Sequence, residues 1–205
     1  SVILYDIVTI STNDIWAVGT YRTENRTTSN TSNNGMKTLT THWNGTVWEV
    51  VPSPNLCKEM NTLESVSATG PDDIWAVGNC SDDYRDSYVG PRLTLVEHWD
   101  GTRWNIVSSP NPGIRHELSA VAAIAPDDAW AVGSQANHTR DLIDRTLAMH
   151  WDGKQWSDVP SPNPSTGHQH FGGLVAVSKD EIWAVGAVDR NVLAARFLRV
   201  TCPIP

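Results

Sequence analysis

The chain has no long apolar segment and no excess of positive charge. Its longest uncharged apolar stretch, Leu118 to Pro126, is nine residues, whereas a membrane-spanning helix needs about 20. Fifteen Lys and Arg stand against 23 Asp and Glu, so the formal net charge is −8. The basic stripe of a nucleic-acid-binding protein is missing. We therefore expect a soluble protein with neither a membrane span nor a nucleic-acid partner.

Cysteine is scarce, and two of the three aromatic residue types are rare. Three Cys are too few for a small scaffold built on disulfides. The sequence begins at Ser1 without a basic and apolar leader, which is typical of a processed chain or an excised segment. Two Phe and four Tyr stand against ten Trp, and this imbalance needs a structural explanation.

The ten Trp residues all belong to an internal repeat. A WAVG motif preceded by an acidic residue occurs four times, with spacings of 59, 55 and 53 residues, around Trp16, Trp75, Trp130 and Trp183. A second motif, H-W-[N/D]-G-x-x-W, is followed each time by Ser-Pro-Asn and occurs at 42–48, 98–104 and 150–156. Repetition at this period predicts a structural role for every Trp.

Each repeat is predicted to contain four short antiparallel strands. An alternating apolar strand precedes the WAVG strand, which is apolar on both faces and is therefore expected to be buried between neighbouring sheets. A third strand ends at the His-Trp pair. A two-residue Asn-Gly or Asp-Gly turn is then expected to lead into a fourth strand. This strand runs into Pro, which favours an outer edge position.

The last repeat is expected to lack its fourth strand. Leu4, Leu63, Leu118 and Phe171 align at one position of the first strand, and residues 191–197 match the third strand. No Asp-Gly turn follows Phe197, so fifteen strands are predicted. Three interpretations stay open: a compact four-bladed propeller with a three-stranded last blade, a propeller whose missing strand comes from a partner chain, and a piece of a larger propeller.

These motifs resemble those of secreted tandem-repeat β-propeller proteins with WAVG and HWDGxxW repeats, a class similar to kelch and galactose-oxidase-like propellers. The resemblance covers essentially all 205 residues. It implies an all-β, four-unit β-propeller of four-stranded antiparallel blades, the last blade lacking its outer strand. We expect one propeller domain, 1–205, with units of approximately 1–56, 57–112, 113–164 and 165–205. Propellers host many unrelated functions, so the resemblance implies little about activity.

The cysteines and glycosylation motifs agree with an exported protein. Cys57 and Cys80 are expected to form a disulfide, because hairpin geometry brings their neighbourhoods together. Cys202 is left over, either as an intermolecular link or as a free buried thiol. Five N-glycosylation motifs, four of them in loops after WAVG strands, begin at Asn25, Asn30, Asn44, Asn79 and Asn137. The predicted location is extracellular or at a cell surface.

Candidate functional residues are few. The G-x-S-x-G, phosphate-binding and H-E-x-x-H motifs are missing, so no catalytic residue and no cofactor are predicted. One repeated slot, interpreted as structural, holds His42, His98 and His150. The candidate ligand-binding residues are Tyr21, Tyr84 and Tyr88. The weak candidates for a metal site are His116, His168 and His170.

The favoured function is that of a non-enzymatic, extracellular or cell-surface interaction or structural propeller with a protein partner. Self-association through the C-terminal edge, Leu198 to Pro205, is one expected form, because an incomplete blade leaves its edge strand unpaired. Two alternatives stay open. One is a carbohydrate-binding, lectin-like propeller, and the other is a secreted hydrolase or lyase that uses His116, His168 or His170.

Overall fold

The computed structural model describes residues 1–22, 35–83, 91–111, 113–136 and 143–198. Within them the chain forms fifteen strands, as many as the sequence predicts, and hydrogen bonding groups these into four consecutive units. Unit 1 contains β1 (Val2–Ser11), β2 (Asp14–Arg22), β3 (Met36–Trp43) and β4 (Trp48–Val51). Unit 2 contains β5 (Met60–Gly70), β6 (Asp73–Ser81), β7 (Leu93–Trp99) and β8 (Trp104–Ile106). Unit 3 contains β9 (Arg115–Ala125), β10 (Asp128–Ala136), β11 (Arg145–Trp151) and β12 (Trp156–Asp158), and unit 4 contains β13 (Gln169–Ser178), β14 (Glu181–Val188) and β15 (Asn191–Leu198).

Every unit is an antiparallel sheet whose strands pair in chain order. Units 1 and 2 are joined in one sheet only by a single parallel bridge between Met36 and Met60, whereas units 3 and 4 are separate sheets. Strands β4, β8 and β12 each pair with one neighbour and lie at the outer edges, as the Pro residues after them predict. Unit 4 has three strands among the described residues.

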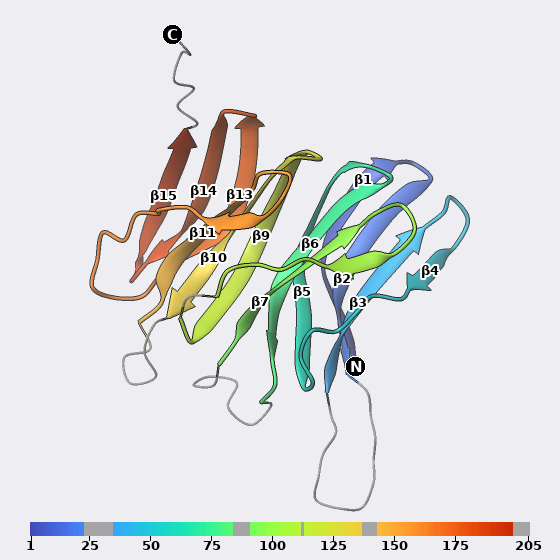
Figure 1. The fold of residues 1–205 in the computed structure, drawn as a ribbon, viewed down its shortest axis with the longest axis horizontal. Coiled ribbons are helices and arrows are strands. Elements are labelled where there is room, and N and C mark those ends of the chain that lie inside the picture. The colour runs from blue at the N-terminus through green and yellow to red at the C-terminus, as the bar shows by residue number, and fades with distance from the viewer. Residues whose placement is uncertain (23–34, 84–90, 112, 137–142, 199–205) are drawn as a thin grey trace, which may run out of the picture.

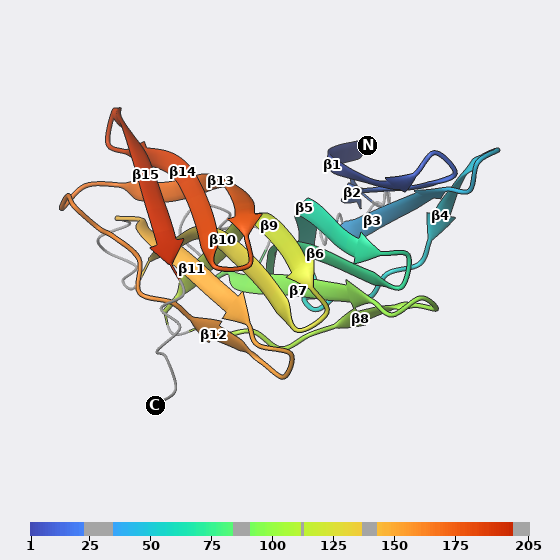
Figure 2. The same ribbon diagram turned by 90° about the horizontal axis from the view of Figure 1, so that it is seen from above.

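The four units form an open arc. Seen from above, the inner strands β1, β5, β9 and β13 follow one another along its concave side, and the outer strands lie on the convex side (Figure 2). Each inner strand contacts the next one in chain order, while units 1 and 4 lie at opposite ends in both views (Figures 1 and 2). The described residues therefore do not close into the compact ring that is one of the three interpretations of the sequence.

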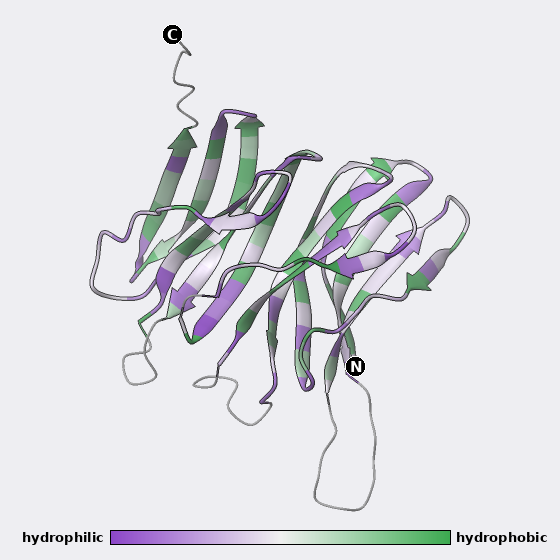
Figure 3. Ribbon diagram, in the orientation of Figure 1, coloured by the Kyte–Doolittle hydropathy of each residue, from purple (hydrophilic) through white to green (hydrophobic). Residues whose placement is uncertain are grey.

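WAVG strands that have a unit on each side are buried between these units, as their doubly apolar pattern predicts. In β6, Trp75 and Val77 pack in a cluster with unit 3, while Ile74 and Ala76 pack in a cluster with unit 1. All four side chains are at most 1 % exposed. Apolar residues run along the strands of every unit (Figure 3), so the core is divided among the three interfaces between units rather than gathered at one centre.

The glycine of each WAVG strand faces a β-bulge in the inner strand. The four aligned residues of the inner strands pair with these glycines, as Leu63 does with Gly78, and each pairing is followed by one extra residue. A Cβ atom at Gly78 would lie 2.0 Å from the Thr62 carbonyl oxygen. Only glycine therefore fits at this position of the motif.

The turns into the fourth strands differ from the predicted two-residue hairpins. Four residues separate the paired strands in each case, at 44–47, 100–103 and 152–155. Gly101 has a φ of +87°, but Asp100 before it does not have a positive φ. Instead Asp100 Oδ1 accepts the backbone N–H groups of Thr102 and Arg103, each at 2.9 Å. The expectation of a two-residue turn is wrong, because the Asp side chain closes a wider turn.

The repeated histidines are structural, as predicted. Each His Nε2 lies next to the Asp that opens the WAVG strand of its own unit, at 2.8 Å for His42 and Asp14 and 2.7 Å for His98 and Asp73. Unit 4 has Arg196 in the His position and Glu181 in the Asp position, and their side chains lie 2.8 Å apart. The pairing of a basic and an acidic group thus recurs where the residue types change.

Candidate functional site

The four bulges place one additional residue on each inner strand. The extra residues occupy equivalent positions in the four units, and they are Tyr5, Glu64, Ser119 and Gly172. A bulge re-aims a side chain away from the regular alternation of its strand. Because the inner strands line the concave side of the arc (Figure 2), this row marks the surface on which neighbouring units contribute residues to one site.

Charged groups from units 2 and 3 gather around two of these residues, Tyr5 and Glu64. Glu117 of β9 accepts a hydrogen bond from Arg115 Nη2 at 2.9 Å and is also paired with Arg92, which precedes β7. All three side chains are largely buried, with Arg92 14 % and Arg115 19 % exposed. We call Tyr5, Glu64, Arg92, Arg115 and Glu117 the inner-strand cluster.

The members of the inner-strand cluster influence one another electrostatically. Burial raises the pKa of Glu64, the negative charge of Glu117 raises it further, and Arg92 partly offsets both effects. Burial and the charge of Glu64 together raise the pKa of Tyr5. The cluster thus presents two guanidinium groups, two carboxyl groups and a phenol, a combination that suits a polar, charged peptide segment.

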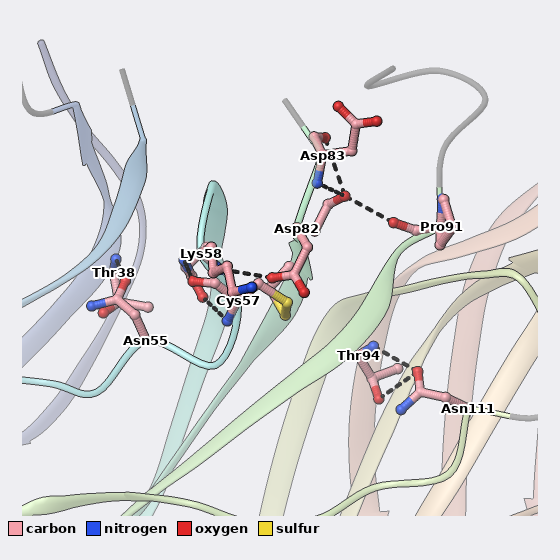
Figure 4. The surroundings of a disulfide bond; sticks show 12 residues. Thr38, Asn55, Cys57, Lys58, Asp82, Asp83, Pro91, Thr94 and Asn111 are labelled. Atoms are coloured by element: carbon pink, nitrogen blue, oxygen red, sulfur yellow. Dashed lines mark hydrogen bonds between the residues drawn. A yellow bond between two sulfur atoms is a disulfide. The ribbon is translucent and has the colours of Figure 1, made fainter. Parts of the chain in front are cut away.

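The predicted disulfide between Cys57 and Cys80 is present beside this surface. The two Cα atoms lie 5.6 Å apart, and the bond ties the loop before β5 to the end of β6 (Figure 4). In the same loop, Lys58 donates its backbone N–H to Asp82 Oδ1 at 2.8 Å. The loop therefore has a fixed position at the rim of the arc. Cys202 lies outside the described residues.

The three histidines proposed for a metal site do not assemble one. His116 is fully buried, and its Nε2 accepts the backbone N–H of Gly113 at 3.1 Å. Asn61 and Gln169 occupy the same repeat position and also bind the loop before their strands. His168 is 61 % exposed, and His170 is exposed. Within the described ranges no group of three His, Cys, Asp or Glu residues could hold a metal ion.

The remaining candidate residues fall into three groups. Tyr21 is half-buried in β2, where it pairs with Val2 and Lys37, and it is not a member of the inner-strand cluster. Asn44 is exposed, whereas Asn79 lies inside β6 and is 6 % exposed, so the structure favours Asn44 of these two as a glycosylation acceptor. Outside the described residues lie Asn25, Asn30, Tyr84, Tyr88, Asn137 and the segment 199–205.

An aromatic groove lies between units 2 and 3 on the outer side. Its volume is about 450 Å³, and it is lined by the Ser108 to Pro110 segment together with Trp151, Gln155 and Trp156. Polar groups beside an aromatic edge are suited to a sugar. The sequence predicts a structural role in the repeat for every Trp. The rims of repeated Trp residues form this groove, so the same Trp can pack in the repeat and also contact a ligand.

The sequence does not predict the inner-strand cluster. Its members lie at positions 5, 64, 92, 115 and 117, and no motif connects them. One signal was available. Tyr5 and Glu64 each directly follow the aligned Leu of the first strand, which is a position where alternation alone does not predict the direction of the side chain.

Comparison with known proteins supports the architecture. No protein-family model and no curated protein sequence matches the chain. Among solved structures, it is similar to YCF48 bound to D1 peptide, with a TM-score of 0.54 and 16 % identity over 98 % of this chain and 54 % of that chain. The fold fits a β-propeller. YCF48 from Cyanidioschyzon merolae matches with a TM-score of 0.48 and 18 % identity, over 98 % of this chain and 57 % of that chain. The chain thus spans about half the length of these propellers.

Proposed function

We propose that the four units are blades of a β-propeller of the WAVG and HWDGxxW repeat class, with three strands in the last blade. The repeat, the order of contacts between inner strands and the likeness to a propeller support this assignment. No helix in the described part of the chain is long and apolar enough to cross a membrane.

The function that we propose is non-enzymatic protein binding at the inner-strand cluster. The observation that carries it is a cluster of charged and phenolic groups, contributed by three units, on or next to the inner strands that line the concave side of the arc. Tyr and Arg are enriched in protein interfaces. A similar propeller has been solved with a bound peptide, which supports the same class of ligand for this fold.

We further propose that the protein acts outside the cell or at its surface. A disulfide between buried cysteines is typical of oxidising compartments, and the exposed glycosylation motif at Asn44 agrees with export. Self-association through Leu198 to Pro205 stays a prediction, because only Leu198 of that segment is described.

A peptide-selection experiment tests the binding site. Peptides selected from a random library on the intact protein should bind Arg115→Ala at least tenfold more weakly, because Arg115 and Glu117 hold the cluster together. The matched control is Arg103→Ala, which removes an Arg that is 79 % exposed in the β7–β8 turn and should bind as wild type does. Equal binding to both variants would contradict the assignment.

A lectin-like function is the second candidate, and the aromatic groove between units 2 and 3 favours it. Binding on a glycan array that is lost in Lys154→Ala, a change at the groove, and kept in Arg115→Ala would favour carbohydrate as the ligand. Hydrolase or lyase activity that disappears in His168→Ala or His170→Ala would instead favour an enzyme, and we propose that none is found.

A further inference from the structure

The interfaces between units repeat one aromatic contact. The WAVG Trp of units 1 and 2 packs against the Trp pair that brackets the β-turn of the next unit, whereas Trp130 of unit 3 packs against Phe197, because unit 4 has no such pair. Trp16 lies 4.7 Å from Trp99 and 5.5 Å from Trp104, with interplanar angles of 50° and 80°. Trp75 meets Trp151 and Trp156 of unit 3 at 5.0 and 5.3 Å, with angles of 54° and 83°. The contact is therefore a specific, reproducible docking geometry.

The last unit presents a WAVG Trp without its partner pair. Trp183 is 38 % exposed, whereas Trp16, Trp75 and Trp130 are between 1 and 6 % exposed. Its own unit already supports it, because its Nε1 donates to Glu181 Oε1 at 2.8 Å and Arg196 lies 5.8 Å from the ring. The side of the ring that meets the next unit elsewhere in the chain is the side left open here.

The first unit presents a Trp pair without its WAVG Trp. Trp43 and Trp48 lie 6.0 Å apart at 45°, which matches the pairs of unit 2, at 5.9 Å and 53°, and unit 3, at 6.1 Å and 44°. Trp48 is 48 % exposed, while its counterparts Trp104 and Trp156 are 4 and 3 % exposed. The receiving geometry is thus already formed before any partner is bound.

The surroundings of these Trp residues are apolar and open in the same way. Next to Trp183, Val175 and Val185 are 56 and 50 % exposed, and in β1 of the unit that carries the open Trp pair, Leu4 and Ile7 are 50 and 59 % exposed. In unit 2, which has a neighbour on each side, the equivalent positions are buried. Val77 corresponds to Val185, Leu63 to Leu4 and Val66 to Ile7, and each is at most 5 % exposed. We call Val175, Trp183 and Val185 the donor face, and Leu4, Ile7, Trp43 and Trp48 the pair face.

We propose that a second copy of this chain occupies these surfaces, with the donor face of one copy packed on the pair face of the other. The two faces are the complementary halves of the interface that already joins unit 1 to unit 2 and unit 2 to unit 3, and one chain carries both. The arc is open between its first and last units (Figure 2). One chain spans 54 % of a propeller of the same fold, so two copies hold enough units to complete a ring.

The contact between copies is head-to-tail. A heterologous contact closes into a ring when the rotation between copies returns to the start, and otherwise it extends the chain of units. Because each copy keeps one face of each kind, the smallest closed form is a ring of two chains. This arrangement differs from pairing at the C-terminal edge, since it uses the flat faces of the end units.

Sedimentation of the intact protein over a concentration series tests the proposal. Wild type should shift from 22.5 kDa at low concentration to about twice that mass or more. Trp183→Ala and Trp48→Ala should each lose the wild-type assembly, because each removes one half of the contact. Leu56→Ala, in an exposed loop Leu outside both faces, is the control and should associate as wild type does. Circular dichroism verifies that the variants are folded.

Mixing the two Trp variants tests the direction of the contact. A mixture of Trp183→Ala and Trp48→Ala contains one intact face of each kind, so it should regain a species of two chains that neither variant forms alone. A wild type that stays at the monomer mass at the highest soluble concentration would overturn the proposal. So would variants that assemble like wild type, or a mixture that regains nothing.

Discussion

A Trp in this chain has an environment set by the unit that follows it. Trp75 is enclosed by His98 of its own unit and by the Trp pair of unit 3. Trp183 belongs to the same WAVG motif, but one face of its ring is open to solvent. The repeat therefore fixes the contacts made within a unit, and the position of the unit in the arc decides how much of the aromatic surface is buried.

Truncating these two Trp residues should have very different effects on stability. Trp75→Ala should lower the free energy of unfolding by about 3–5 kcal/mol, because it removes a buried aromatic side chain and leaves a cavity. Trp183→Ala, measured in dilute monomer, should lower it by less than about 1 kcal/mol, since exposed positions contribute little. Urea denaturation measures both. A Trp75→Ala protein that melts within about a degree of wild type would contradict the burial of the motif.

Glu97 should make the stability of the protein depend on pH. The side chain is fully buried, and this burial raises its pKa from 4.5 to about 8, with a smaller opposing effect of the Ser53 hydroxyl. The unfolded chain releases this proton near pH 4.5 and the folded protein does so near pH 8. The stabilisation of the protonated native form is therefore complete below pH 4.5 and is lost progressively as the pH rises to 8.

The variant Glu97→Gln isolates this effect, because it keeps the shape and removes the titration. The melting temperature of wild type should fall between pH 5.5 and 8 more steeply than that of Glu97→Gln. The exposed Glu49→Gln is the control for loss of a negative charge. Parallel pH profiles for wild type and Glu97→Gln would show that the carboxyl is not held in its protonated form.

At the scale of strands, the sequence predicts what depends on local patterns and misses what depends on irregularity. The strand order, the two apolar faces of the WAVG strands and the outer position of the Pro-terminated strands follow from alternation and residue type. The bulges do not, because an extra residue only shifts the phase of the alternation by one position, which alone does not identify a bulge. The inner-strand cluster depends on those bulges and on contacts between units, so it emerges only from the structure.

The bulges predict which glycine can be replaced. Gly78→Ala should abolish or severely weaken folding, since the new Cβ would meet backbone atoms of β5 at 2.0 Å. Gly70→Ala, at the end of β5, is the matched control, because its Cβ would meet nothing nearer than an Asp72 carboxyl oxygen at 3.6 Å. Thermal melts of the two variants measure the difference. Equal stability would mean that the strand can move away from the bulge.

The whole molecule is an arc with two unlike, apolar ends and a net negative charge. In repeat architectures each unit is stabilised by its neighbours, so the end units gain the most from an additional contact. The charge of −8 opposes this gain, because two copies of the same chain repel each other. Association through the end faces is therefore a balance between burial of Trp surface and repulsion between like-charged copies.

This balance predicts the effect of salt on self-association. The Debye length falls from about 30 Å at 10 mM to less than about 8 Å at 500 mM ionic strength, so salt screens the repulsion while the apolar contact persists. The dissociation constant measured by sedimentation should therefore decrease several-fold as NaCl rises from 10 to 500 mM, and Trp183→Ala should remain monomeric throughout. Weaker association at high salt would indicate that ion pairs, and not the Trp faces, hold the copies together.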